Sequence, residues 1–319
     1  MNKISKDCSC MKKFTVAAMA ALIVFTCCGC SFLTREASPQ SIVKEYIDVS
    51  DSGDAYESAA RYIAEERSGA IVSILSTYYI TSGGRTEKQT VSSSGIVLNS
   101  DGYILTSASV GTAQVSDQEY SASKVSAVLA PVYGDDSLYT LREIDSDSES
   151  GLALYKFYDN FYYTDESGTQ RDGLQFTAQL SENEVKTGDS CWAVGNSLGD
   201  LFSEAYDLTI TGGIVSDEAT DTNIFSLTYN EKQYSFMQTT VPTTTEMLGC
   251  GLFDKNGYLI GMFSSKIVSE SNGSQNYLDR SSLFYKTDII QDYINSVSQE
   301  LQTVIRYSVA SSSSEEADA

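Results

Sequence analysis

The feature that most constrains the fold is a series of short β-rich segments that fills residues 69 to 262. Each segment is rich in Val, Ile, Leu, Thr and Tyr, and Gly, Asn, Asp or Ser separates it from the next. Many short strands with closely spaced turns and few helices are typical of antiparallel barrels and sandwiches. The clearest pair is LFDKNGYLIGM, residues 252–262, in which two apolar runs are joined through Asn256-Gly257, a strong hairpin signal. The sequence therefore predicts an all-β fold.

Composition narrows the class of protein further. A chain of 319 residues can bury a large core, and 41% apolar with 20% charged residues are typical of a globular protein. The net charge of −22 disfavours nucleic acid and anionic lipid surfaces as electrostatic partners. The chain contains no histidine, so we expect no zinc site. We also expect no other metal and no cofactor.

Residues 1–30 have the pattern of a targeting segment. Met11-Lys12-Lys13 precedes the apolar run FTVAAMAALIVFTCC, which is too short to cross a bilayer comfortably and is typical of a secretory signal peptide. The following Cys27-Cys28-Gly29-Cys30 resembles a bacterial lipoprotein signal, and by that resemblance Cys30 becomes the lipid-modified first residue. The mature protein is then expected to be anchored to the cell membrane outside the cytoplasm. An ordinary cleaved signal and an uncleaved membrane anchor stay open.

Two of the seven cysteines, Cys191 and Cys250, lie in the β-rich region, and the other five occur at or before position 30. Outside the cytoplasm this pair could form a disulfide. It could equally remain as two buried free thiols in strands.

Helical patterns flank the β-rich region. Ser38-Pro39 is typical of a helix start, and SIVKEYI and AYESAARYIAEE have helical spacing, so residues 31–68 are predicted to be a helical segment. Thr287 can cap a second helix, predicted over 287–305, whose apolar residues lie on one face and should pack on the barrel. The Ser/Glu-rich residues 306–319 are predicted to be a disordered tail.

Five segments, in order, resemble the trypsin-like proteases of the HtrA (high-temperature-requirement) family. They are SSGIVLNSDGYILTSASV at 93–110, ESGLALYKF at 149–157, GDSCWAVGNSLG at 188–199, ITGGIVS at 210–216 and FMQTTVPTTTEMLGCGLFDKNGYLIGM at 236–262. The resemblance covers roughly residues 69 to 300. It implies a chymotrypsin-like fold of two six-stranded antiparallel β-barrels, about 69–168 and 169–286, with a cleft between them and the closing helix 287–305.

The same resemblance locates the catalytic positions, and each holds a residue without the required chemistry. The family's histidine falls on Ser109, its aspartate on Gly151 and its serine nucleophile on Leu248. Serine takes up no proton near neutral pH, glycine has no carboxylate, and leucine has no nucleophilic atom. Glu246 replaces a glycine of the oxyanion loop, where a side chain is strained and a carboxylate repels an oxyanion. A chain without histidine cannot supply the family's base from another position.

These substitutions predict an inactive serine-protease homologue, a pseudoprotease that is not an enzyme and binds a peptide or protein partner. Two alternatives stay open. An active serine-type or rewired peptidase of the same fold would need a nucleophile, a serine or Cys250, beside a base such as Lys255 or Lys266. A structural surface protein would have a filled cleft and would associate with itself.

Overall fold

The computed structural model describes residues 55–115, 118–134, 137–165, 167–196, 208–220, 227–264 and 282–310. All of them belong to one compact unit of the chain, residues 39–319. The predicted signal segment 1–30 with Cys30, residues 31–54 of the helical segment and residues 311–319 of the predicted tail lie outside the described residues.

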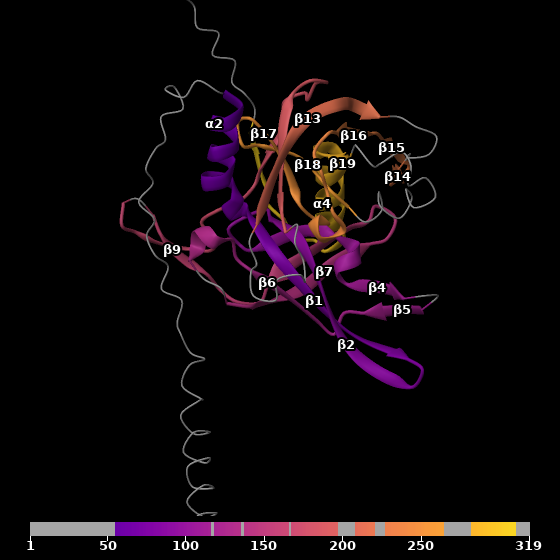
Figure 1. The fold of residues 1–319 in the computed structure, drawn as a ribbon. Coiled ribbons are helices and arrows are strands. Elements are labelled where there is room, and N and C mark those ends of the chain that lie inside the picture. The colour runs from indigo at the N-terminus through magenta and orange to yellow at the C-terminus, as the bar shows by residue number, and fades with distance from the viewer. Residues whose placement is uncertain are drawn as a thin grey trace, which may run out of the picture. The chain divides into compact units, whose positions relative to one another are not determined.

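Six antiparallel strands in the first half of the chain form a closed barrel (Figure 1). Their order around the ring is β1 (Ile71–Ser82), β2 (Arg85–Val97), β3 (Tyr103–Ser107), β8 (Leu152–Phe157), β7 (Tyr139–Asp147) and β6 (Lys124–Val128). Strands β1 and β2 pair without interruption from Ile71–Ile96 to Ser82–Arg85. Gly83 and Gly84, with φ of 59° and 80°, make the tight turn between them, because this hairpin turn needs positive φ. The far end of this hairpin projects from the barrel beside a smaller hairpin of β4 (Thr112–Val115) and β5 (Gln118–Ser121) (Figure 1).

A second ring of six antiparallel strands follows. Its order is β17 (Gly251–Asp254), β12 (Ser190–Gly195), β13 (Thr209–Thr220), β16 (Phe236–Thr239), β19 (Ser282–Lys286) and β18 (Leu259–Met262), and pairing of β17 with β18 closes the ring. Two short strands, β11 (Gln179–Ser181) and β20 (Ser308–Ala310), extend it in parallel beside β18. The prediction of two six-stranded antiparallel barrels is confirmed.

The hairpin predicted at residues 252–262 is confirmed as β17–β18. The Asp254 carboxylate accepts hydrogen bonds from the backbone N–H groups of Asn256 and Tyr258, each at 2.9 Å. Gly257 takes a φ of 73°, which a three-residue hairpin loop requires at its last position. Two further small hairpins form separate two-stranded sheets, β9 (Tyr162–Thr164) with β10 (Gln170–Asp172) and β14 (Leu227–Tyr229) with β15 (Lys232–Tyr234).

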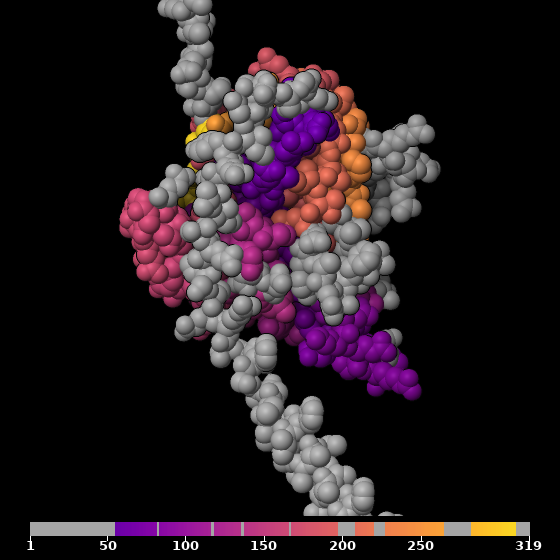
Figure 2. All heavy atoms as spheres, turned by 60° about the vertical axis from the view of Figure 1, so that its left-hand side comes forward, coloured from indigo at the N-terminus to yellow at the C-terminus, as the bar shows by residue number. Residues whose placement is uncertain are grey.

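The helical segment before the first barrel comprises α2 (Ala55–Tyr62), a π-helical turn η2 (Ile63–Arg67) and a 3-10 turn η3 (Ser68–Ala70). Helix α2 packs on the second barrel, where the Tyr56 ring lies 4.8 Å from the ring of Trp192 on β12. Figure 2 shows α2, in indigo, lying over the salmon and orange strands of that barrel. Gly212 of β13 makes the contact possible, because a side chain there would meet the Tyr56 hydroxyl and the Trp192 ring.

Helix α4 (Thr287–Glu300) closes the fold and buries the apolar face that the sequence predicts, namely Ile289, Ile290, Tyr293, Ile294 and Val297. It ends five residues earlier than predicted, because the chain turns after Leu301 and Gln302 adopts a φ of 50°. The prediction that disorder begins at residue 306 is also wrong, since residues 308–310 form β20 and pair with β11. In the described ranges, no helix is long and apolar enough to span a membrane.

Three apolar clusters hold these elements together. One fills the first barrel around Ile74, and one fills the second around Val215. The third joins the two barrels and the helices, because it includes Leu154 of β8, Phe253 of β17 and Ile290 of α4. Burying each such side chain stabilises the fold by about 1.5–3 kcal/mol, so the third cluster holds the two barrels against each other.

Candidate functional site

Leu248 lies in the loop that connects a 3-10 turn, η7 (Thr245–Met247), to β17, and its side chain is half-buried. Its carbonyl oxygen accepts a hydrogen bond of 2.7 Å from the backbone N–H of Ser94 on β2, in the other barrel. The next residue, Gly249, has a φ of +85°, and a Cβ there would collide with the Ser94 carbonyl oxygen. The loop at the predicted nucleophile position therefore lies directly against the first barrel.

Gly151 lies in the turn between β7 and β8 with a φ of 72°. Its carbonyl oxygen accepts hydrogen bonds from the backbone N–H of Ala108 at 2.9 Å and from the Ser264 hydroxyl at 2.8 Å. Ser264 follows Phe263, whose carbonyl oxygen accepts the N–H of Gly249 at 2.7 Å. Two hydrogen bonds and one peptide bond thus connect the aspartate position with the residue after the nucleophile position.

Ser109 lies in the 3-10 turn η4 (Ala108–Val110), directly after β3. Its hydroxyl is 3.1 Å from the Ser107 hydroxyl, and its carbonyl oxygen accepts the Tyr78 hydroxyl at 3.2 Å. Ala108, the residue before Ser109, donates its backbone N–H to the carbonyl of Gly151, the predicted aspartate position. Ser109 therefore follows directly after a residue that contacts this position. The structure therefore brings Ser109, Gly151 and Leu248 to one stretch of the seam between the barrels, which we call the triad seam.

The loop that would form an oxyanion hole is closed by a hydrogen bond within its own turn. The N–H of Leu248 donates to the Thr245 carbonyl oxygen at 3.3 Å, within its own turn. Glu246 lies in that turn. Among the described residues, positive φ occurs outside glycine at Asn230, Glu231 and Gln302, so the backbone of Glu246 is not in the strained conformation expected at a glycine position. An N–H that is bonded inside its own turn is not directed at a developing oxyanion.

A tyrosine–glutamate pair lies next to the turn that carries Ser109. The Tyr155 hydroxyl donates to a Glu143 carboxylate oxygen at 2.7 Å, and both oxygen atoms lie 2.8 Å from the position that a Cβ on Gly111 would occupy. Burial, and then the hydrogen bond to Glu143, raise the pKa of Tyr155. The phenol therefore stays protonated near neutral pH and serves as a donor rather than as a base.

Cys191 and Cys250 are both free and buried. In the pairing of β12 with β17, Cys191 is opposite Asp254, which is four residues beyond Cys250. Four strand residues span about 13 Å, whereas disulfide-bonded Cα atoms are less than about 7 Å apart. The two thiols are thus too far apart for the disulfide considered from sequence.

Neither thiol has the environment of a nucleophile. Burial raises the pKa of Cys250, and burial followed by repulsion from Asp189 raises that of Cys191 to about 12. Reactive cysteines instead have lowered pKa values beside positive charge. The described ranges also hold no group of three or more acidic or cysteine side chains arranged to bind a metal.

Sequence reasoning missed the residues that support the triad seam. Ser94 and Ser264 are fully buried and link the two barrels by hydrogen bonds. Serine is a residue type favoured in turns, so the residue type alone offered no signal for a buried role between the barrels. The contact of Ser94 with Leu248 could be found only from the way the strands pair in three dimensions.

Comparison with known proteins agrees with this geometry. The family model described as trypsin-like peptidase domain matches residues 93–262, which is more than half of the chain. A curated protein from Ectopseudomonas mendocina (strain ymp), "Probable periplasmic serine endoprotease DegP-like", is 28% identical over 191 residues. That match covers 60% of this chain and 32% of the relative, so the chain spans about a third of the relative's length.

Solved structures share the fold. The HtrA-type protease AlgW with a decapeptide superimposes with a TM-score of 0.54 at 21% identity, covering 78% of this chain and 69% of that one. A variant of AlgW with a decapeptide superimposes equally well, with the same identity and with 68% of that chain covered. The family model, which matches more than half of the chain, leads to one conclusion that the double-barrel architecture agrees with: the chain belongs to the trypsin-like peptidase domain family.

Proposed function

We propose that this chain is a catalytically inactive member of its family, a pseudoprotease that binds a peptide or protein partner. The observation that carries the proposal is the content of the triad seam. Ser109, Gly151 and Leu248 lie where the family's histidine, aspartate and serine are expected, and none can act as base, carboxylate or nucleophile. The bonded N–H of Leu248 adds support, because the transition state would also lose an oxyanion donor.

The expected location is the outer side of a bacterial cell membrane, with Cys30 carrying the lipid. The pattern of residues 11–30 supports this, and so does the relative whose name places it in the periplasm. Two solved relatives contain a decapeptide, which supports a peptide as the kind of partner.

Labelling with a fluorophosphonate probe tests the loss of the nucleophile. The purified chain should remain unlabelled under reducing and oxidising conditions, because no hydroxyl in the triad seam has a base to activate it. Heat-denatured protein serves as the control for non-specific labelling. Labelling of the native chain that disappears in a point variant of the triad seam would contradict the proposal.

Peptide binding is tested separately by fluorescence anisotropy with labelled casein-derived peptides. A large charged residue in the triad seam, Leu248→Arg, should weaken binding, since Leu248 is half-buried there. The matched control is Leu138→Arg, because Leu138 is 51% exposed on the first barrel and outside the triad seam. Equal effects of the two variants, or no binding by the unaltered chain, would exclude this seam as the peptide site.

A further inference from the structure

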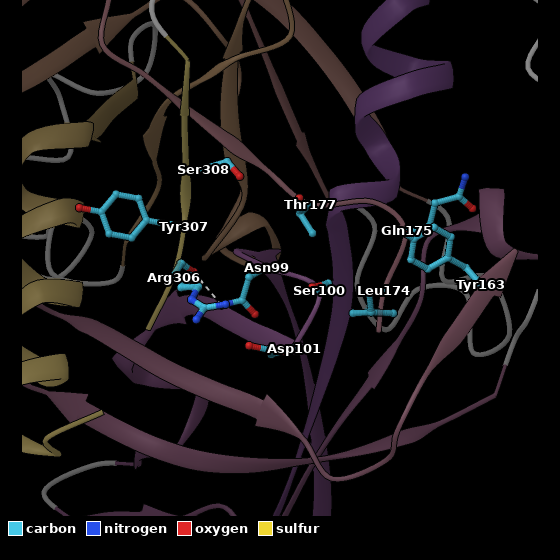
Figure 3. A pocket seen from close by; sticks show the side chains of 10 residues that line it. All are labelled: Asn99, Ser100, Asp101, Tyr163, Leu174, Gln175, Thr177, Arg306, Tyr307 and Ser308. Carbon is cyan, nitrogen blue, oxygen red and sulfur yellow. Dashed lines mark hydrogen bonds between the residues drawn. The ribbon is translucent and has the colours of Figure 1, made fainter. Parts of the chain in front are cut away.

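The chain has a polar hollow at the opposite end of β3 from Ser109. It has a volume of about 430 Å³ and is lined by residues from three separate segments and from β9 (Figure 3). These are the β2–β3 turn (Asn99, Ser100 and Asp101), the connection between the barrels (Leu174, Gln175 and Thr177), the segment after α4 (Arg306, Tyr307 and Ser308) and Tyr163. We call this hollow the linker pocket.

The walls of the linker pocket are held by bonds that need no ligand. The Asn99 side-chain amide donates to the carbonyl oxygen of Arg306 at 2.7 Å, which ties the segment after α4 to the β2–β3 turn. The N–H of Leu174 donates to the carbonyl oxygen of Ser100 at 3.0 Å, which ties the connection between the barrels to the same turn. Pairing of β20 with β11 fixes the far side. A site built in advance binds a ligand without losing free energy to ordering its walls.

Several polar side chains of the linker pocket have no partner among the described residues. Within the described ranges, Ser100, Asp101, Gln175, Thr177 and Arg306 form no side-chain hydrogen bond or ion pair. Figure 3 shows Gln175 and Leu174 on one side of the hollow, and Asn99, Arg306 and Asp101 on the other. The set therefore offers two hydroxyls, a carboxamide, a carboxylate and a guanidinium, which together donate and accept in many directions.

This chemistry selects the class of ligand. Most small-molecule pockets of this size are lined mainly by apolar side chains, whereas most residues lining this one are polar and Leu174 is only 2% exposed. A simple anion would face the Asp101 carboxylate, and a simple cation would face Arg306. A neutral molecule with many hydroxyl groups can donate to Asp101 and accept from Arg306, Gln175 and Thr177 at once. We propose that the linker pocket binds a neutral saccharide, with a carbon face of the sugar against the ring of Tyr163.

The proposal does not depend on the loss of catalysis. The linker pocket and the triad seam lie at opposite ends of β3, so a ligand in one leaves the other accessible. Failure of the peptide-binding test above would leave the saccharide proposal unaffected. Failure of the saccharide test would likewise leave the proposed function unaffected.

Saturation-transfer NMR and calorimetry with glucose, galactose, N-acetylglucosamine and their disaccharides test the proposal on the purified chain. At least one saccharide should bind at millimolar concentration, and Gln175→Ala or Arg306→Ala should weaken it about tenfold, because each removes a hydrogen-bond partner. The control variants Gln89→Ala and Arg85→Ala change the same residue types on the exposed β1–β2 hairpin and should leave affinity unchanged. Circular dichroism and Trp192 fluorescence verify that all four variants are folded.

Three results would overturn the proposal. The first is the absence of binding by every saccharide tested. The second is saccharide binding that the Gln175 and Arg306 variants do not weaken. The third is tighter binding of inorganic phosphate or of glycine than of any saccharide, which would assign the linker pocket to an anion or a zwitterion instead.

Discussion

Gly249→Ala tests how tightly the triad seam is packed. Gly249 has a φ of +85°, a conformation that costs an alanine about 1–2 kcal/mol. Its Cβ would also lie 2.5 Å from the Thr106 hydroxyl and closer still to the carbonyl oxygen of Ser94, where real Cβ atoms keep at least 3.0 Å. The Thr106 hydroxyl donates to that same carbonyl at 2.6 Å, so relief of the collision breaks this bond or moves β2. Overpacking of this kind adds about 1–3 kcal/mol, for a total loss of roughly 2–5 kcal/mol.

Gly84→Ala is the matched control. Gly84 has nearly the same φ, +80°, and nothing lies within 4 Å of the position its Cβ would occupy. The Gly84→Ala variant should therefore lose only the backbone contribution of about 1–2 kcal/mol to the free energy of unfolding. The difference between the variants isolates the packing of the nucleophile loop against the first barrel, and we expect about 2 kcal/mol.

Urea unfolding followed by the fluorescence of Trp192, the only tryptophan, measures both variants. Trp192 is 1% exposed and lies in the second barrel, so unfolding changes its environment strongly. Equal losses of stability in Gly249→Ala and Gly84→Ala would show that the loop does not contact β2 as described. The account of the triad seam would then be wrong.

Three other predictions concern the Cys191 thiol, the proposed loss of the triad and the proposed lipid anchor. The pKa of Cys191 is raised from 9.0 to about 12, so the contribution of the protonated thiol to stability is complete below pH 9 and is lost as the pH rises toward 12. In urea titrations between pH 9 and 10, the unaltered chain should therefore lose about 1 kcal/mol more of its free energy of unfolding than Cys191→Ala. Equal losses in the two proteins would exclude the shift. The triple variant Ser109→His, Gly151→Asp and Leu248→Ser should still not hydrolyse casein, because an aspartate at a φ of 72° is strained and the N–H of residue 248 is bonded to the Thr245 carbonyl. Measurable turnover by this variant would show that only the three side chains were missing. Cells expressing the full chain should incorporate labelled palmitate, and Cys30→Ser should abolish it, whereas unchanged incorporation would place any lipid elsewhere.

The sequence predicted the parts of the fold that carry a strong local pattern. The β17–β18 hairpin follows from the Asn256-Gly257 turn between two apolar runs, and α4 follows from apolar residues at helical spacing after Thr287. The positions Ser109, Gly151 and Leu248 followed from resemblance to family motifs, and the structure brings them together.

Other features depend on contacts between distant segments and could not be predicted locally. Strand β20 has no alternating pattern, and it forms because β11 offers a free edge beside it. The linker pocket is assembled from residues near positions 100, 175 and 306, so no single stretch of sequence contains its pattern. The 3-10 turn that occupies the N–H of Leu248 likewise depends on how the loop packs against Ser94.

Hydrolysis of fluorescein-labelled casein by the purified native chain tests the central claim most directly. We predict a rate equal to that of buffer, with and without reductant, and the same rate for Cys250→Ala, since the proposed pseudoprotease has no nucleophile paired with a base in the triad seam. Turnover above the buffer rate that a single substitution at Cys250, Ser109 or Leu248 removes would contradict the claim that this member of the family has lost its chemistry.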